Sequence, residues 1–227
     1  MITCYQIKPE TGDKLSFEVQ NHKDLAPREL NSHSDLPDWV KLEHHQCPVC
    51  PFHSENITYC PAAFEMQDVI HQCSNCISYE RVELSRLAEE GTVTTEIDMQ
   101  KALFAVIGEK VISSGCSRLN SRQWSLGYYS ILTTPENLFY RSLSSYLMRQ
   151  FFASPGNFHP DLKGHLDYID DVITIFGKLF ERIRGVSSMD ASNNALVSIF
   201  MSAKLVRRKR DDWLDDLKGK MGLSSTE

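Results

Sequence analysis

The feature that most constrains this chain is a cysteine-rich segment at residues 44–64, which reads HHQCPVCPFHSENITYCPAAF. It contains Cys47, Cys50 and Cys60, and a proline follows each of them. Two residues between Cys47 and Cys50 let one tight turn aim both sulfur atoms at the same ion. The prolines stiffen that turn because each fixes its own φ angle. The segment therefore predicts half of a metal site.

The rest of the sequence predicts that these thiols stay reduced. The N-terminus lacks a basic stretch followed by a long apolar run, so we expect no signal peptide. The longest apolar run, residues 102–107, is too short to span a bilayer. The sequence thus predicts a cytoplasmic protein with no membrane segment, and seven cysteines cannot form a fully paired disulfide framework.

Hydrophobic alternation predicts two β-hairpins. One joins residues 2–7 to 15–19, and the other joins 80–84 to 93–97 with Gly91 in its turn. A third strand is expected over Trp39–Leu42, leading into the cysteine segment.

Helical periodicity occurs once between the two hairpins and then dominates the chain after them. Pro61 suits the first position of a helix, and a second helix is expected between Asp98 and Gly115. Further helices are expected to start at Thr134-Pro135, at Pro160-Asp161 and near Asp190, the last running to about Lys220.

These elements predict an α+β fold in which a small antiparallel sheet from the N-terminal hairpins packs with a C-terminal helical part. Residues 1–97 would form the β-rich part with the cysteine loop, and residues 98–227 the helical part. We expect the two parts to fold together as one domain.

The spacing of the cysteines leaves two ways to complete a four-ligand site. A local completion uses Cys73 and Cys76, which gives a spacing near that of a four-cysteine ribbon. A non-local completion uses Cys60 and Cys116, since Cys116 follows a helix-ending glycine and can reach across the fold. His53 is a further alternative ligand. Spacing alone does not choose between them.

Five short segments resemble the motifs of an uncharacterised bacterial family, a domain of unknown function with HQCPxCP, YCPxA and SGC motifs. They are HQCPVCP (45–51), YCPAA (59–63), SYERVEL (78–84), SSGC (113–116) and YLMRQFF (146–152). The resemblance implies the ligand set Cys47, Cys50, Cys60 and Cys116. The chain departs from the family pattern at Ser117, where the family usually has proline. The family carries no activity to transfer.

Four thiolates favour zinc or an iron–sulfur cluster over hard cations. We expect a structural zinc ion in a non-enzymatic protein with a regulatory or scaffolding role, which forms a homodimer through its C-terminal helix or binds another protein. An iron–sulfur or thiol-based redox sensor is the alternative interpretation. An enzyme of unrecognised type is the second alternative, and a polar pocket away from the cysteines would favour it.

Two charged stretches near the C-terminus have simpler interpretations than a ligand site. A helix would place Asp211, Asp212, Asp215 and Asp216 on one face. The stretch 204–210 is basic, but a net charge of −6 and the neighbouring aspartates argue against nucleic-acid binding. We interpret both as a charged helix surface with pairs such as Arg208–Asp212.

Overall fold

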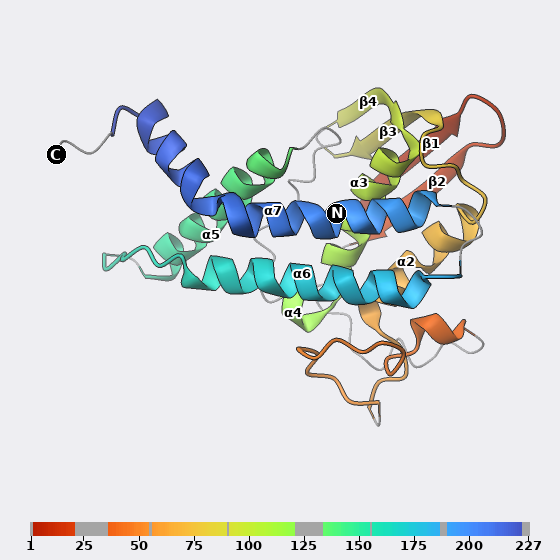
Figure 1. The fold of residues 1–227 in the computed structure, drawn as a ribbon, viewed down its shortest axis with the longest axis horizontal. Helices are drawn as coiled ribbons and strands as arrows, with labels where there is room; N and C mark the ends of the chain where they lie inside the picture. The colour runs from red at the N-terminus through yellow and green to blue at the C-terminus, as the bar shows by residue number, and fades with distance from the viewer. Residues whose placement is uncertain are drawn as a thin grey trace.

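The fold is α+β, as predicted (Figure 1). A computed structural model describes residues 2–20, 36–54, 56–89, 91–120, 134–154, 156–186 and 190–223, and for Asn120 the backbone only.

Both predicted hairpins form, and they join into one antiparallel sheet of four strands. The order is β2-β1-β3-β4, so the first strands of the two hairpins lie side by side. Tyr5, for example, pairs with Phe17 on one side and with Arg86 on the other. The strands are β1 (Ile2–Pro9), β2 (Leu15–Gln20), β3 (Arg81–Ala88) and β4 (Gly91–Asp98).

Six helices lie in the described residues, most of them after the sheet. They are α2 (Pro61–Gln72), α3 (Met99–Ser113), α4 (Ser117–Asn120), α5 (Pro135–Ala153), α6 (Lys163–Ile183) and α7 (Ala191–Lys220). Thr134 caps α5 by accepting a hydrogen bond from the N–H of Asn137 at 3.2 Å. Helix α6 begins slightly later than predicted, where the Asp161 side chain accepts from the N–H of Lys163 at 2.9 Å.

Helix α3 is the central element of the molecule. It packs against the sheet and against α2, α4 and α7, while α6 and α7 run side by side across the outside (Figure 1). Nearly every residue of α3 is therefore buried, including two charged ones. Glu109 pairs with Arg86 at 3.5 Å, and Lys110 pairs with Asp68 at 3.0 Å. These partners offset the cost of burying charge in the centre of the fold.

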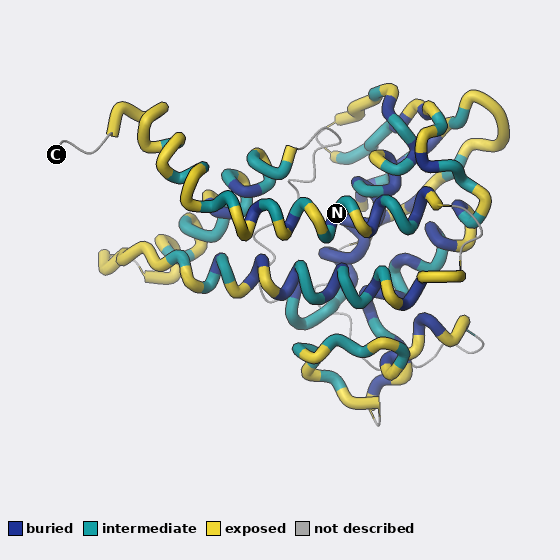
Figure 2. Tube along the Cα trace, viewed as in Figure 1, coloured by how far each residue is buried: buried dark blue, intermediate teal, exposed yellow. Residues whose placement is uncertain are grey.

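One hydrophobic cluster extends through both parts of the chain. It includes Tyr5 and Phe17 of the sheet together with Phe139, Phe176 and Leu196 of the helices. Figure 2 shows the buried residues concentrated where α3 meets the sheet and the α6–α7 pair, and the C-terminal end of α7 exposed. The β-rich part, residues 1–97, and the helical part, residues 98–227, both contribute to this cluster.

The predicted strand over Trp39–Leu42 is wrong. Residues Asp38–Val40 form a short 3-10 helix, η1, and Lys41 makes only an isolated bridge with Tyr59. Among the described residues, the carbonyl of Val40 accepts a hydrogen bond from the N–H of Cys60 at 2.9 Å, but the other main-chain carbonyls of Trp39–Leu42 do not pair across to a neighbouring segment in this way. Three of them accept hydrogen bonds from the side chain of Arg182 instead.

Candidate metal centre

The cysteine loop, residues 41–60, lies along the lower edge of the molecule in Figure 1, below α4, with the sheet at the upper right. The N–H of Cys50 donates to the carbonyl of Cys47 at 3.0 Å, which closes a tight turn between the two cysteines. The Gln46 side chain donates to the carbonyl of Phe52 at 2.9 Å and braces that turn from outside. The turn has the form expected of a metal knuckle.

Cys60 occupies the N-cap position of α2, directly before Pro61. Its thiol receives hydrogen bonds from the backbone N–H groups of Ala62 and Ala63. These are N–H groups that the first turn of a helix leaves without intrahelical partners. Such donors stabilise a sulfur atom that carries negative charge.

Cys116 follows the end of α3, where Gly115 has a φ of 81°. This positive φ suits glycine and turns the chain out of the helix. The backbone N–H groups of Arg118 and Leu119 hydrogen-bond the Cys116 thiol. Cys60 and Cys116 thus share one arrangement, a thiol at the start of a helix.

The structure brings the four cysteines of the non-local completion together around one small cavity of about 20 Å³. We call Cys47, Cys50, Cys60 and Cys116 the four-cysteine set. A cavity of this size has room for roughly one water-sized sphere. Its other lining is mostly apolar, apart from Gln46, Arg118 and Arg182. Three of the four thiols belong to the cysteine loop, and the fourth, Cys116, comes from a segment that is distant in sequence.

The thiols are not arranged as a finished coordination shell. All four are free cysteines, and the described residues contain no group of three or more histidine, cysteine, aspartate or glutamate side chains placed to hold a metal ion. The donor set itself is that of a zinc or iron–sulfur site.

The environment raises the pKa of three thiols of the set, which favours their protonated form when no cation is bound. Burial, together with the nearby Cys60 thiol, raises the pKa of Cys47 to about 12 and that of Cys116 to about 12. Burial also raises the pKa of Cys60, against the effect of Arg182 and the N–H groups at the start of α2. A bound cation would have to displace these protons.

Arg182 of α6 is the residue at this site that sequence reasoning missed. It is only 2% exposed, and its guanidinium donates to the carbonyl of Trp39 at 3.0 Å, of Lys41 at 2.5 Å and of Leu42 at 2.9 Å. Its Nε atom is buried without a hydrogen-bond partner. In the part of the chain that the structure describes, no carboxylate forms an ion pair with it.

The local completion of the site would need cysteines that lie elsewhere. Cys60 precedes α2 and Cys73 follows it, and a helix of 12 residues is about 18 Å long at 1.5 Å per residue. Cys73 and Cys76 contact each other at the far end of α2. They do not line the cavity of the four-cysteine set.

A family comparison covers nearly the whole chain. The family described as Domain of unknown function (DUF6901) matches residues 3–221. The chain belongs to the DUF6901 family. This confirms the predicted resemblance to an uncharacterised domain family. No curated protein and no solved structure matches this DUF6901 chain.

The histidines of the cysteine loop lie outside the cavity of this DUF6901 protein. His53 is exposed, and its carbonyl accepts hydrogen bonds from the N–H groups of Asn56 and Ile57. His45 has a φ of 49° and points its Nδ1 atom at Glu181, 3.4 Å away. Neither side chain contributes to the lining around the thiols.

The charged stretches of α7 form ion pairs on its surface. Asp212 pairs with Lys209 at 2.7 Å, one position away from the predicted Arg208–Asp212 pair. Arg207 pairs with Asp170 of α6 at 2.9 Å. The remaining aspartates of the acidic cluster pair as Asp211–Arg210, Asp215–Lys218 and Asp216–Lys220. This is the charged helix surface that we expected from the sequence.

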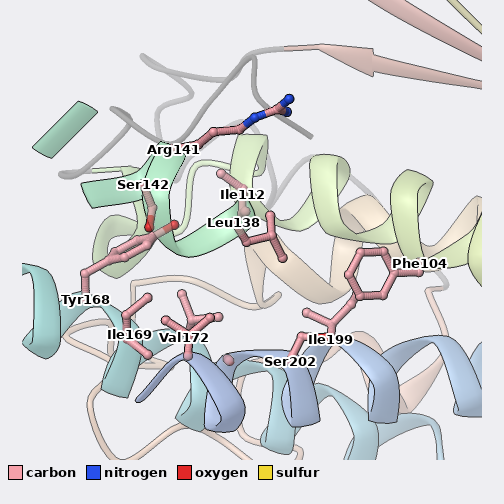
Figure 3. A pocket seen from close by; sticks show the side chains of 12 residues that line it. Phe104, Ile112, Leu138, Arg141, Ser142, Tyr168, Ile169, Val172, Ile199 and Ser202 are labelled. Atoms are coloured by element: carbon pink, nitrogen blue, oxygen red, sulfur yellow. The ribbon is translucent and has the colours of Figure 1, made fainter. Parts of the chain in front are cut away.

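A second cavity, of about 60 Å³, lies between α3, α5, α6 and α7 (Figure 3). Its walls are mainly apolar, including Phe104, Ile169 and Ile199. Ser142 and Tyr168 lie at one end, and the side chain of Arg141 points away from the interior (Figure 3). It is therefore not the polar pocket that the enzyme hypothesis required.

Within the described residues, no helix of the DUF6901 chain is both long enough and apolar enough to cross a bilayer.

Proposed function

We propose that this DUF6901 protein is a non-enzymatic protein stabilised by a structural zinc ion on the four-cysteine set. The observation that carries the proposal is the position of the four thiols. They reach one small cavity from the cysteine loop and from the distant segment at Cys116, beside a buried arginine. Zinc is the default ion for a closed set of four thiolates.

Charge balance supports an anionic centre at this place. Zinc with four thiolates carries a net charge of two negative units. A buried guanidinium is costly unless an anion lies close to it, and Arg182 is buried beside the thiols with its Nε atom unpartnered. Its positive charge already lowers the pKa of Cys47 and of Cys60, against burial. A zinc–thiolate centre would supply the missing negative charge.

The proposed ion would fasten three elements together. Cys47 and Cys50 belong to the cysteine loop, Cys60 begins α2, and Cys116 lies between α3 and α4. In the described residues the loop follows a short 3-10 helix and makes one isolated bridge, Lys41 with Tyr59, so it has little regular structure of its own. Metal binding would therefore add directly to the free energy of folding.

A regulatory or scaffolding role in the cytoplasm is the biological task that fits such a site. Reduced thiols persist in that compartment, which is where a thiolate centre is stable. We include a homodimer through the C-terminal helix in this proposal. Helix α7 packs on α3, α5 and α6 of its own chain, and Met201, 53% exposed, remains on its outer surface for a partner.

The metal content of protein purified without oxygen tests the proposal. We expect one zinc ion per chain by elemental analysis and no absorbance in the visible range. If the protein contains iron and sulfide and is brown, the site holds an iron–sulfur cluster instead of zinc, and redox sensing becomes the leading function. Protein that contains no metal and takes up none would refute the metal centre.

Single substitutions test the ligand set. Cys50→Ser and Cys116→Ser should each lower the bound metal to the same extent, since both remove one of four thiolates. Cys73→Ser is the matched control, because it is the same chemical change at the other end of α2, and it should keep the full metal content. If Cys73→Ser loses the metal while Cys116→Ser keeps it, the ligands are instead Cys47, Cys50, Cys73 and Cys76.

A further inference from the structure

A second dithiol lies at the C-terminal end of α2, and the proposed metal centre does not use it. We propose that Cys73 and Cys76 form a redox-active pair, which exchanges with small disulfides of the glutathione class and closes to an intramolecular disulfide.

The backbone already holds the two cysteines in a geometry that suits a disulfide. The N–H of Cys73 donates to the carbonyl of Val69 at 2.9 Å as α2 ends, and the N–H of Cys76 donates to the carbonyl of Cys73 at 3.1 Å. In a turn of this kind the first and fourth Cα atoms lie within about 7 Å. Disulfides bridge Cα atoms about 4.4–6.8 Å apart. The side chains also meet, because the Cys73 thiol hydrogen-bonds Cys76.

The two thiols differ in exposure, which separates their roles. Cys76 is partly exposed, whereas Cys73 is fully buried in the hydrophobic cluster. The hydrogen bond from Cys73 lowers the pKa of Cys76. The same hydrogen bond and burial raise the pKa of Cys73. Cys76 is thus the thiol that an external disulfide can reach and that ionises first. Cys73 is the resolving thiol.

The reaction balances without a further reagent. The Cys76 thiolate attacks one sulfur of the small disulfide, a mixed disulfide forms on Cys76, and the other half leaves as a thiolate that takes up a proton. Cys73 then loses its proton and attacks the Cys76 sulfur, which expels the second small thiol. The protein loses two protons and two electrons, which together are two hydrogen atoms, and the small disulfide is reduced to two thiols.

Because the pair lies at a helix C-terminus, ionisation of the Cys76 thiol depends on the hydrogen bond from Cys73. The helix dipole places partial negative charge at this end, which disfavours a thiolate. Glu80 acts in the same direction by raising the pKa of Cys76. We therefore expect Cys73→Ser, which keeps a hydrogen-bond donor, to react faster at Cys76 than Cys73→Ala, which has none.

The full chain, as purified, is incubated with oxidised glutathione, quenched with an alkylating agent and cut after glutamate residues. Cleavage after Glu65 and Glu80 releases residues 66–80, whose two cysteines are Cys73 and Cys76. We expect this peptide to lose two hydrogen atoms. Cys76→Ser should abolish the loss, and Cys73→Ala should stop at a mixed disulfide on Cys76.

Cys4 is the internal control, because it is a partly exposed thiol whose neighbour is the hydroxyl of Ser16 at 3.5 Å. It should gain only the mixed disulfide. If Cys4 reacts while the peptide 66–80 keeps two free thiols, the proposal is overturned. A mixed disulfide on Cys76 that never resolves in the unsubstituted chain overturns it as well. Neither result depends on whether the four-cysteine set binds metal.

Discussion

Arg182 donates a hydrogen bond of 2.9 Å from its Nη2 atom to the carbonyl oxygen of Leu42, a residue 140 positions earlier in the chain. This bond and those to Trp39 and Lys41 attach the start of the cysteine loop to α6. The loop is therefore fixed at one end by a single buried side chain.

Arg182→Met should destabilise the protein by about 3 kcal/mol or more, because it removes three buried hydrogen bonds while keeping most of the apolar stem. The carbonyl of Lys41 would keep a second donor, the N–H of His44 at 3.2 Å. Urea denaturation measures the change. Arg184→Met is the control, since Arg184 is exposed two residues away on the same chain segment, and it should change stability by less than about 0.5 kcal/mol. Equal effects of the two substitutions would contradict the structural role of Arg182.

Removal of the proposed zinc should lower the melting temperature and expose the cysteine loop. Structural zinc adds its binding energy to folding, and each kcal/mol corresponds to about 2–4 °C for a chain of this size. Calorimetry with and without a chelator measures the shift, and limited proteolysis should show new cleavage within residues 41–60. Cys73→Ala should respond as the unsubstituted chain does. An unchanged melting temperature after chelation would count against a structural ion.

Acid should destabilise the helical part through His165. This side chain is 1% exposed and contacts the Ser142 hydroxyl at 2.9 Å. Because Ser142 donates its proton to the carbonyl of Phe139, His165 Nε2 donates in turn to Ser142. Burial, with Arg210 nearby, lowers the pKa of His165 to about 4 from 6.5.

The folded state therefore favours neutral His165, and its contribution is complete above pH 6.5 and lost as the pH falls toward 4. The loss should reach about 3 kcal/mol at 1.36 kcal/mol per pKa unit. Urea midpoints at several pH values should show a weaker pH dependence in His165→Asn across this window. Parallel curves for the two proteins would show that His165 does not titrate as described.

Gly164→Ala should destabilise α6, although alanine usually favours a helix over glycine. An added Cβ would lie 2.5 Å from the Tyr146 hydroxyl, which accepts a hydrogen bond from Gln150 at 2.8 Å. We expect a loss of about 1–2 kcal/mol in the free energy of unfolding. Gly219→Ala in α7 is the control, because no atom lies within 4 Å of its Cβ, and it should be neutral or stabilising. A stabilising Gly164→Ala would show that Tyr146 moves aside freely.

Local patterns predicted the sheet and most helices because their signals are short-range. The alternation of Tyr5 and Ile7 and the cap at Thr134 each specify an element within a few residues. The error at Trp39–Leu42 has a non-local cause, since Arg182 of α6 donates to three of its four carbonyls. No pattern within the segment contains that information.

The candidate site shows the same division. The spacing of Cys47 and Cys50 predicts their turn. Spacing did not decide whether Cys116 or the pair Cys73 and Cys76 completes the site, and the resemblance to a family favoured Cys116. Arg182 gave no signal, because a single arginine on an amphipathic helix resembles any solvated charge. Its burial follows from the packing of α6 on the cysteine loop, which only the fold specifies.

The wide sequence separation within this site also imposes an order of events on a chain that emerges from the ribosome. Cys47, Cys50 and Cys60 appear first, and Cys116 follows only after α2, the β3–β4 hairpin and α3 have been made. Arg182 comes later still, near the end of α6. The hydrogen bonds that attach the start of the cysteine loop to Arg182 therefore cannot form until most of α6 has been synthesised.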